Sequence, residues 1–272
     1  MPQGFRLAIL AIGLSALPLA LGAQAFEPGC ALPFEAIKGE DLKIDAQCDI
    51  EGAGGSATKI AESRAKNNFC ASGPVASLTF ASFRKLQQKT DEGKAEGLNF
   101  KADRELLKDI HTTSDGDTVG EGSLAKVAAL VLEAHHANSK KNGEAVNCNH
   151  KGDPWNDVHI ALVKTKNADE CSSITAEISP HFRPDDWTPD ALEDLERPVR
   201  ITGHLFFDTA HAPCHDGVKP SPRRQSVWEI HPVYRIEVCS SGSLSACKAS
   251  DDSKWKDLDV WLAEHAEEMP DP

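Results

Sequence analysis

Two strand-like runs near the carboxyl end constrain the fold more than any other feature. Residues 199–208 and 226–238 are rich in β-branched, aromatic and bulky apolar side chains, which are typical of strands. After Pro232 the second run alternates between apolar and charged residues, as a strand with one buried face does. Gly203 indicates a bulge or a sharp bend, a device that curls a sheet into a small barrel.

The residues before these runs complete a recognisable order of elements. Residues 157–166 and 173–179 are predicted strands, and residues 188–196 are a predicted helix. Residues 123–138 are ambiguous by periodicity, but the Gly-rich lead-in and the turn that follows favour a strand. Strand, strand, strand, helix, strand, strand is the order of the five-stranded OB barrel. We therefore expect a mainly β fold with an OB-like barrel; an α+β sandwich with an open antiparallel sheet is the alternative.

The rest of the chain divides around this barrel. Residues 26–118 are expected to form an N-terminal extension with short helices, and residues 119–272 the barrel domain with a C-terminal helix. The amphipathic or Ala-rich patterns predict helices at 57–68, 82–94, 101–110 and 257–268.

The first 25 residues have the pattern of a secretory signal. Arg6 is the only charged residue before the apolar run Leu7–Leu21, and Ala23-Gln24-Ala25 supplies an A-x-A cleavage site. The run is shorter than the roughly 20 residues that a spanning helix needs. We expect a mature chain that begins at Phe26, is periplasmic or secreted, and has no membrane span.

All the cysteines follow the signal. An even number of cysteines in an exported chain indicates disulfide bonds. The candidates are Cys30, Cys48, Cys70, Cys148, Cys171, Cys214, Cys239 and Cys247. Local spacing favours a Cys148–Cys171 bond and a Cys239–Cys247 bond, although many pairings remain open. The sequence contains no C-x-x-C motif, which argues against a thiolate metal site.

The chain is strongly acidic. Its formal net charge is −13, and without Arg6 the 28 remaining basic residues face 42 acidic ones, which gives −14. Such a surface repels nucleic acid at long range, so a nucleic-acid partner is not expected. It suits a cation or a cationic partner.

A group of histidines, acids and one arginine accompanies the last two predicted strands. The members are His204, Asp208, His211, His215, Arg224, Glu229 and His231. Imidazole and carboxylate groups in an oxidising compartment suit zinc or copper, and a metal with an open position activates water. The same groups can also form a buried polar network that fixes the loop, or a metal-free acid–base pair.

The segment that carries this group resembles a family of exported bacterial proteins. The resemblance rests on the phrase from Gly203 to Asp208, on His211, and on Trp228-Glu229-Ile230-His231-Pro232, which match G-x-L-x-x-D-x-x-H and W-E-I-H-P. It covers about residues 120–240. It implies an exported protein with a barrel-like domain, and it assigns no activity.

Two further sets are weaker candidates. A second histidine set consists of His135, His136, His150 and His159, of which adjacent members on a strand point to opposite faces. An aromatic set consists of Phe182, Trp155, Trp187 and Trp228. Such aromatic residues can stack on bases or sugars, but we interpret them as core residues.

The sequence favours an exported, disulfide-stabilised binding or structural domain. The alternative is a metal-dependent hydrolase that uses Asp208, His211, Glu229 and His231, with zinc or copper as the metal. Nucleophile chemistry has little support, because the chain has no G-x-S-x-G motif and no phosphate-binding glycine loop. Whether the protein is an enzyme stays open at this point.

Overall fold

The computed structural model describes residue 1 and residues 48–71, 73–137 and 143–265. The predicted signal segment, apart from Met1, and the candidate Cys30 lie outside these residues. Among the described residues, no helix has the length and apolar character needed to cross a membrane.

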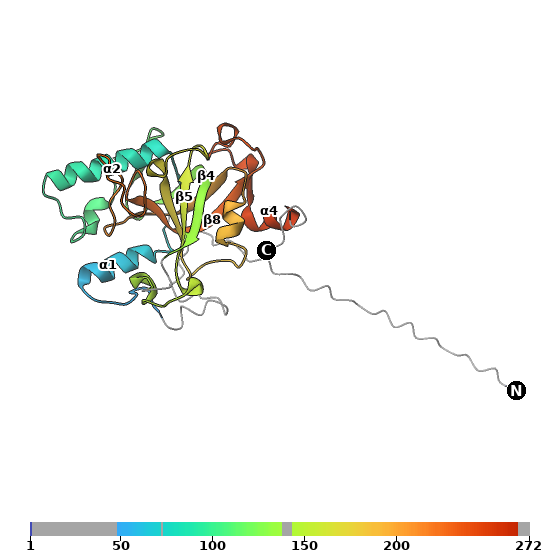
Figure 1. Cartoon of the computed structure of the whole chain (residues 1–272), viewed down its shortest axis with the longest axis horizontal. Coiled ribbons are helices and arrows are strands. Elements are labelled where there is room, and N and C mark those ends of the chain that lie inside the picture. Colours follow the sequence, from blue (N-terminus) through green and yellow to red (C-terminus); the bar gives the residue numbers. More distant parts are fainter. Residues whose placement is uncertain (2–47, 72, 138–142, 266–272) are drawn as a thin grey trace.

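Five strands form a closed barrel at the centre of the molecule (Figure 1). They are β4 (Leu124–His136), β5 (Val158–Val163), β6 (Ile174–Ile178), β7 (Val199–Phe207) and β8 (Trp228–Cys239). They pair in the order β4-β5-β6-β8-β7, and β7 pairs back onto β4. Helix α3 (Pro189–Glu193) lies between β6 and β7 in the chain. This is the OB-like order that the sequence predicts, and the β4–β7 pairing excludes the open-sandwich alternative.

Strand β4 closes the barrel because it is long enough to pair with two neighbouring strands. Its first half, from Leu124 to Ala129, pairs with β7, and its second half, from Leu130, pairs with β5. Within the pairing with β5, the register shifts between Val131 and Glu133. The ambiguous stretch 123–138 is therefore a strand, with Ala129 and Val131 fully buried.

Gly203 lies at an irregularity between β7 and β8, as predicted. The register of the pair shifts on both sides of this residue. A Cβ atom at Gly203 would lie 2.3 Å from the carbonyl oxygen of Pro232, so a side chain cannot fit without moving the backbone. The absence of a side chain at Gly203 lets the two strands approach closely and bend there, which helps the sheet to close into a barrel.

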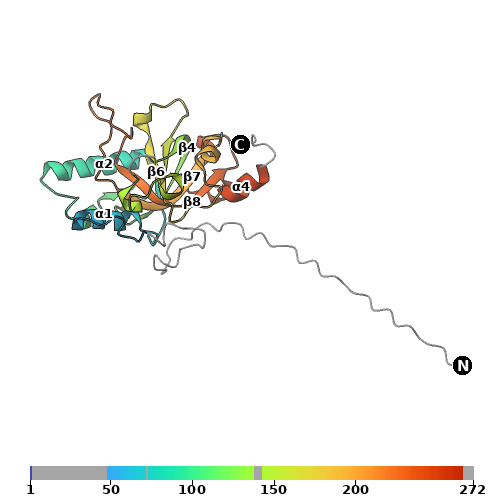
Figure 2. The same cartoon turned by 60° about the horizontal axis from the view of Figure 1, so that its bottom comes forward.

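The helices cover two sides of the barrel. Helices α1 (Ala57–Lys66) and α2 (Phe80–Ala95) lie on one side, and α4 (Leu258–His265) lies on the other (Figures 1 and 2). Thr79 caps α2 with a reciprocal hydrogen-bond pair to Ser82, which explains why this helix begins where it does. The predicted helix at 101–110 is reduced to a 3-10 turn at Arg104–Leu107.

Short elements complete the fold. Strand β1 (Ala76–Leu78) pairs in parallel with β4, and β9 (Trp255–Asp257) pairs antiparallel with β8. Neither was predicted, because three residues are too few to show a periodicity. Strands β2 (His111–Thr112) and β3 (Thr118–Val119) form a separate hairpin. Further 3-10 turns lie at Ala145–Asn147, Asp153–Trp155, Glu170–Ser172, Leu244–Ala246 and Asp252–Lys254.

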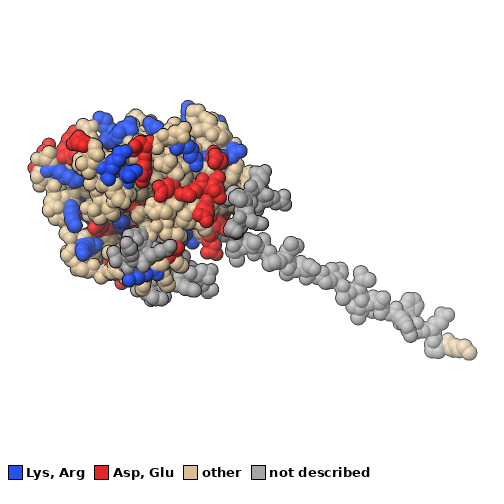
Figure 3. All heavy atoms as spheres, viewed as in Figure 1, with Lys and Arg blue, Asp and Glu red and all other residues tan. Residues whose placement is uncertain are grey.

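The aromatic candidates mostly belong to the core, as interpreted. Trp187 and Trp228 are fully buried in the main apolar cluster, and Phe182 packs against it. Trp155 is half-buried and lies against the ring of His150, with the ring centroids 5.2 Å apart. On the face shown in Figure 3, acidic and basic side chains are interspersed, and the basic ones form no continuous stripe.

Three disulfide bonds join described cysteines. Cys239–Cys247 is present, as predicted from spacing. The predicted Cys148–Cys171 bond is wrong: Cys148 pairs with Cys48, and Cys171 pairs with Cys214. The observed partners are 100 and 43 residues apart in sequence, and tertiary folding alone brings such distant residues together. The disulfides are consistent with a protein of an oxidising, non-cytoplasmic compartment.

Candidate metal centre

A cluster of acids and histidines lies where β5, β6 and β8 meet. Asp157 directly precedes β5, His159 lies on β5, Glu177 on β6 and His231 on β8. His159 and Glu177 are direct cross-strand partners, so their side chains share a face. Glu144 comes from the loop before β5; its carboxylate oxygen accepts the backbone N–H of Asp157 at 2.8 Å.

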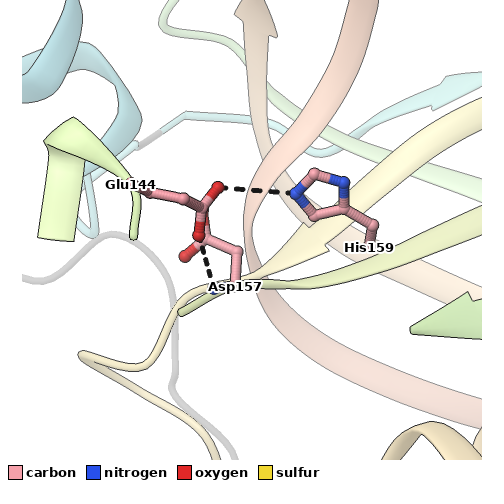
Figure 4. Close-up of side chains that lie close together, drawn as sticks. All are labelled: Glu144, Asp157 and His159. Atoms are coloured by element: carbon pink, nitrogen blue, oxygen red, sulfur yellow. Dashed lines mark hydrogen bonds and ion pairs between the residues drawn. The ribbon is translucent and has the colours of Figure 1, made fainter. Parts of the chain in front are cut away.

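Two overlapping triads in this cluster have the composition of a metal site. The first consists of Asp157, Glu177 and His231, all buried. The second consists of Glu144, Asp157 and His159 (Figure 4). In each triad, one potential ligand atom per residue lies within 4.8 Å of the others. Asp157 is common to both.

Several distances in the cluster are those of metal ligands rather than of hydrogen bonds. His231 Nε2 lies 3.6 Å from Asp157 Oδ2, and His159 Nε2 lies 3.5 Å from Glu144 Oε1. Hydrogen bonds between such atoms are about 2.7 to 3.2 Å long. Two ligands on one tetrahedral zinc ion, with bonds of about 2.0 to 2.1 Å, are about 3.4 Å apart.

Four buried atoms here have no hydrogen-bond partner among the described residues: His159 Nε2, His231 Nε2, Asp157 Oδ2 and Glu177 Oε2, the last of which forms ion pairs with Lys66 and His231. Buried polar atoms are nearly always paired, so such atoms mark a place where a partner of another kind fits. The other ring nitrogen of His231 is directed at carboxylates: Nδ1 lies 2.7 Å from Glu177 Oε2 and 3.4 Å from Glu229 Oε1.

The electrostatics of the cluster favour positive charge. Burial is the largest effect on the His231 imidazole and opposes its charge, but Glu229 and above all the Glu177 carboxylate together outweigh burial and raise the pKa of the ring to about 10. The same carboxylate and Glu144 raise the pKa of His159 to about 9 against the effect of burial. Burial, together with the charge of Glu144, raises the pKa of Asp157 to about 7.

Lys66 brings a further cation to the cluster from the last turn of α1. Its Nζ lies 3.6 Å from Glu177 Oε2, and its side chain is mostly covered. Burial lowers the pKa of the amine, but the charges of Glu177, Glu229 and Asp208 exceed this effect and raise it well above its ordinary value.

The structure brings most of the predicted polar group into one adjoining network. Arg224 donates from Nη1 to Glu229 Oε2 at 2.6 Å and from Nη2 to Asp208 Oδ2 at 2.5 Å, and all three side chains are buried. The ring of His211 lies on the exposed side, with Nδ1 donating to Asp208 Oδ2 at 2.7 Å. Arg224 therefore satisfies the carboxylates that the sequence assigned to a metal.

The other two predicted histidines have different surroundings. His204 is buried, accepts the Gly122 backbone N–H at Nε2, and donates from Nδ1 to the His231 carbonyl at 2.7 Å. Both nitrogens are thus occupied, and burial lowers the pKa of the ring to about 4. His215 is exposed, and its Nδ1 donates to the Pro213 carbonyl oxygen.

Within the second histidine set, His159 belongs to the metal-like cluster. The ring of His135 lies 5.6 Å from that of His159, and its side chain is half exposed beside Glu133. His150 contacts Trp155 instead.

Sequence reasoning did not assign Glu144, Asp157, Glu177 or Lys66 to a site. One signal was present: Asp157 and His159 are two positions apart at the start of a strand, which places both side chains on one face. Glu177 and Lys66 gave no comparable signal, because Glu177 is the single charged residue of β6 and Lys66 is one of four charged residues in α1.

Fold and cluster together define an OB-like barrel protein with a buried histidine–carboxylate centre. No family model, curated protein or solved structure matches the chain.

Proposed function

We propose that this protein is an exported metal-binding domain whose barrel holds a divalent transition-metal ion between Asp157, Glu177 and His231. The observation that carries the proposal is the pair His231 Nε2 and Asp157 Oδ2. Both atoms are buried and 3.6 Å apart, and neither has a hydrogen-bond partner among the described residues. Imidazole and carboxylate donors in this combination suit zinc and its neighbours in the first transition row.

The orientation of the His231 ring supports the same assignment. A histidine that binds a metal through one nitrogen usually donates its other ring N–H to a carboxylate, which fixes the tautomer. Nδ1 of His231 lies beside the carboxylates of Glu177 and Glu229, so Nε2 is the nitrogen left for a metal.

The charges around the centre also favour a cation. The interacting carboxylates are Glu144, Asp157, Glu177, Asp208 and Glu229, and the permanent cations are Lys66 and Arg224. When His159 and His231 are neutral, as metal ligands must be, and all five carboxylates are ionised, the carboxylates exceed these two cations by three charges. Because an uncompensated buried charge is strongly unfavourable, a divalent cation offsets a large part of this excess.

Export is the second part of the proposal. It rests on the apolar run and A-x-A sequence in the first 25 residues and on the three disulfide bonds. The periplasm and the extracellular space both fit these features.

A hydrolase built on Asp208, His211, Glu229 and His231 has less support than metal binding at Asp157. The guanidinium of Arg224 lies between Asp208 and Glu229 and donates hydrogen bonds to both carboxylates. A metal at that position would have to displace a buried cation.

Metal content of the mature protein, purified without a histidine tag, tests the proposal. Elemental mass spectrometry after zinc loading and dialysis should find at least about one equivalent of zinc. His231→Ala should lose this ion, and so should Asp157→Asn, which keeps the shape of the side chain. His215→Ala, which alters an exposed histidine, is the matched control and should retain it.

Circular dichroism identifies the variants that keep the native fold. If the folded wild type binds no zinc, or if folded Asp157→Asn binds as much as the wild type, the proposal is wrong.

A further inference from the structure

We infer that the cluster takes a second cation at Glu144, Asp157 and His159, with Asp157 bridging the two ions and one coordination position open to a small anion or water. This inference rests on the proposed function, because it adds a second ion to the same centre.

The two triads supply three protein donors for each ion. Each has its own histidine and its own glutamate, and Asp157 is the single shared residue. A carboxylate has two oxygens, each able to accept more than one partner. Oδ2 of Asp157 faces His231, whereas Oδ1 accepts a hydrogen bond from Asn147 Nδ2 at 3.0 Å, which holds the carboxylate in place.

The geometry at His159 repeats the geometry at His231. Nε2 of His159 is buried and has no hydrogen-bond partner among the described residues. It lies 3.5 Å from Glu144 Oε1, again the spacing of two ligands on one ion, and 3.6 Å from Oε1 of Glu177, which belongs to the first triad. Figure 4 shows the side chain of Glu144 extended toward the His159 ring from the loop opposite β5.

The two positions differ in their access to solvent. Asp157 and His231 are fully buried, but the side chains of Glu144 and His159 are each 19% exposed. Zinc ions with structural roles are closed off by protein ligands, whereas zinc ions that react keep three protein ligands and one open position. Each triad supplies three protein ligands, and the Glu144–Asp157–His159 triad is the less deeply buried of the two, so we assign the open position to it.

Lys66 makes the open position suitable for an anion. Its ammonium group lies 3.6 Å from Glu177 Oε2, its side chain is 15% exposed, and its charge also acts on Glu144. A cation beside a metal ion stabilises a small anion or a metal-bound hydroxide there. The chemical class of ligand that we assign is thus a monodentate inorganic anion or water.

Cobalt substitution tests the inference without any assumption about a reaction. The mature protein with its disulfides intact is stripped of metal, loaded with Co²⁺ and dialysed. Its cobalt content is measured, and its visible absorption is followed during titration with azide. We expect about two equivalents of cobalt, as in two-metal centres, and an azide-dependent change in the absorption bands.

Variants assign each ion to its triad. His159→Ala and the milder Glu144→Gln should each retain about one equivalent and lose the response to azide. His135→Ala, which alters the neighbouring half-exposed histidine, should behave as the wild type.

The outcomes separate the two proposals. In one outcome, the wild type binds only about one equivalent of cobalt, which His159→Ala retains and His231→Ala loses. That result overturns the second ion and leaves the proposed function intact. Two equivalents with no azide response overturn the open position. A protein that binds no cobalt and no zinc overturns both proposals.

Discussion

Arg224 donates from Nη1 to Glu229 Oε2 at 2.6 Å, and neither side chain is exposed to solvent. The second arm of the guanidinium binds Asp208, which is also buried. A buried arginine is tolerated because two carboxylates compensate it, so the removal of either leaves charge without a full partner.

Asp208→Ala is therefore expected to lower the free energy of unfolding by about 3 to 5 kcal/mol, the usual cost of breaking a buried ion pair. Urea denaturation at neutral pH measures this change. His211→Ala, which removes the half-exposed partner of the same carboxylate, should cost no more than about 1 kcal/mol. Zinc content should not change in either variant. If both variants lose equally small amounts of unfolding free energy, the ion-pair network around Arg224 does not stabilise the fold.

His204 should make stability depend on pH in a defined window. Burial lowers the pKa of this imidazole to about 4, whereas an unfolded histidine has a pKa of about 6.5. In the unfolded chain His204 thus binds a proton below about pH 6.5, whereas in the folded protein it binds one only near pH 4. The contribution of His204 is complete above pH 6.5 and decreases by about 3 kcal/mol as the pH falls to 4.

His204→Gln isolates this contribution, because glutamine can donate to the His231 carbonyl and accept from Gly122 as histidine does. Both proteins are unfolded with urea at several pH values in the presence of a chelator, so that metal binding plays no part. The wild type should have the higher free energy of unfolding, and its difference from His204→Gln should decrease as the pH falls from 6.5 to 4. A difference that is constant over this range would contradict the lowered pKa of His204.

The disulfide Cys48–Cys148 should stabilise the fold more than Cys239–Cys247. The first links residues 100 positions apart and the second residues 8 apart, and a longer closed loop restricts the unfolded chain more. Replacing both cysteines by serine should cost about 4 to 5 kcal/mol for the first pair and about 2 to 3 kcal/mol for the second. Urea unfolding under non-reducing conditions provides the comparison, and the reverse order would argue against this account.

Gly203→Ala should destabilise the barrel by about 2 kcal/mol or more, because the new Cβ would meet the Pro232 carbonyl oxygen at 2.3 Å. Gly242→Ala is the matched control: it places a Cβ where no atom lies within 4 Å. Thermal unfolding followed by circular dichroism distinguishes the two. A Gly203→Ala protein as stable as Gly242→Ala would mean that the two strands separate there at little cost.

Local patterns were sufficient to predict β5 to β8, whereas β4 was ambiguous by periodicity and was predicted from the turn signals on either side of it. The residues of β5, β6, β7 and β8 have alternating or wholly apolar side chains, and the helix before β7 has a Thr188 cap. The short strands β1 and β9 were missed because their pairing partners, rather than their own residues, make them strands.

The polar residues that cluster in the structure were predicted only in part from the sequence. Asp208, Arg224 and Glu229 are close in sequence to the strands that position them, so their proximity could be inferred. The metal-like triads instead combine residues from three strands and a preceding loop, and Lys66 comes from a helix more than 90 positions before Asp157.

The sequence by itself determined the order of the barrel strands and the acidic character of the chain, and its cysteines and predicted signal segment led us to expect an oxidising compartment. These properties depend on composition and on the period of neighbouring residues. Only the tertiary structure decided which cysteines pair, which carboxylates Arg224 satisfies, and which histidine nitrogens remain without a partner. Those features depend on distances between residues far apart in the chain, and closure of the barrel sets these distances.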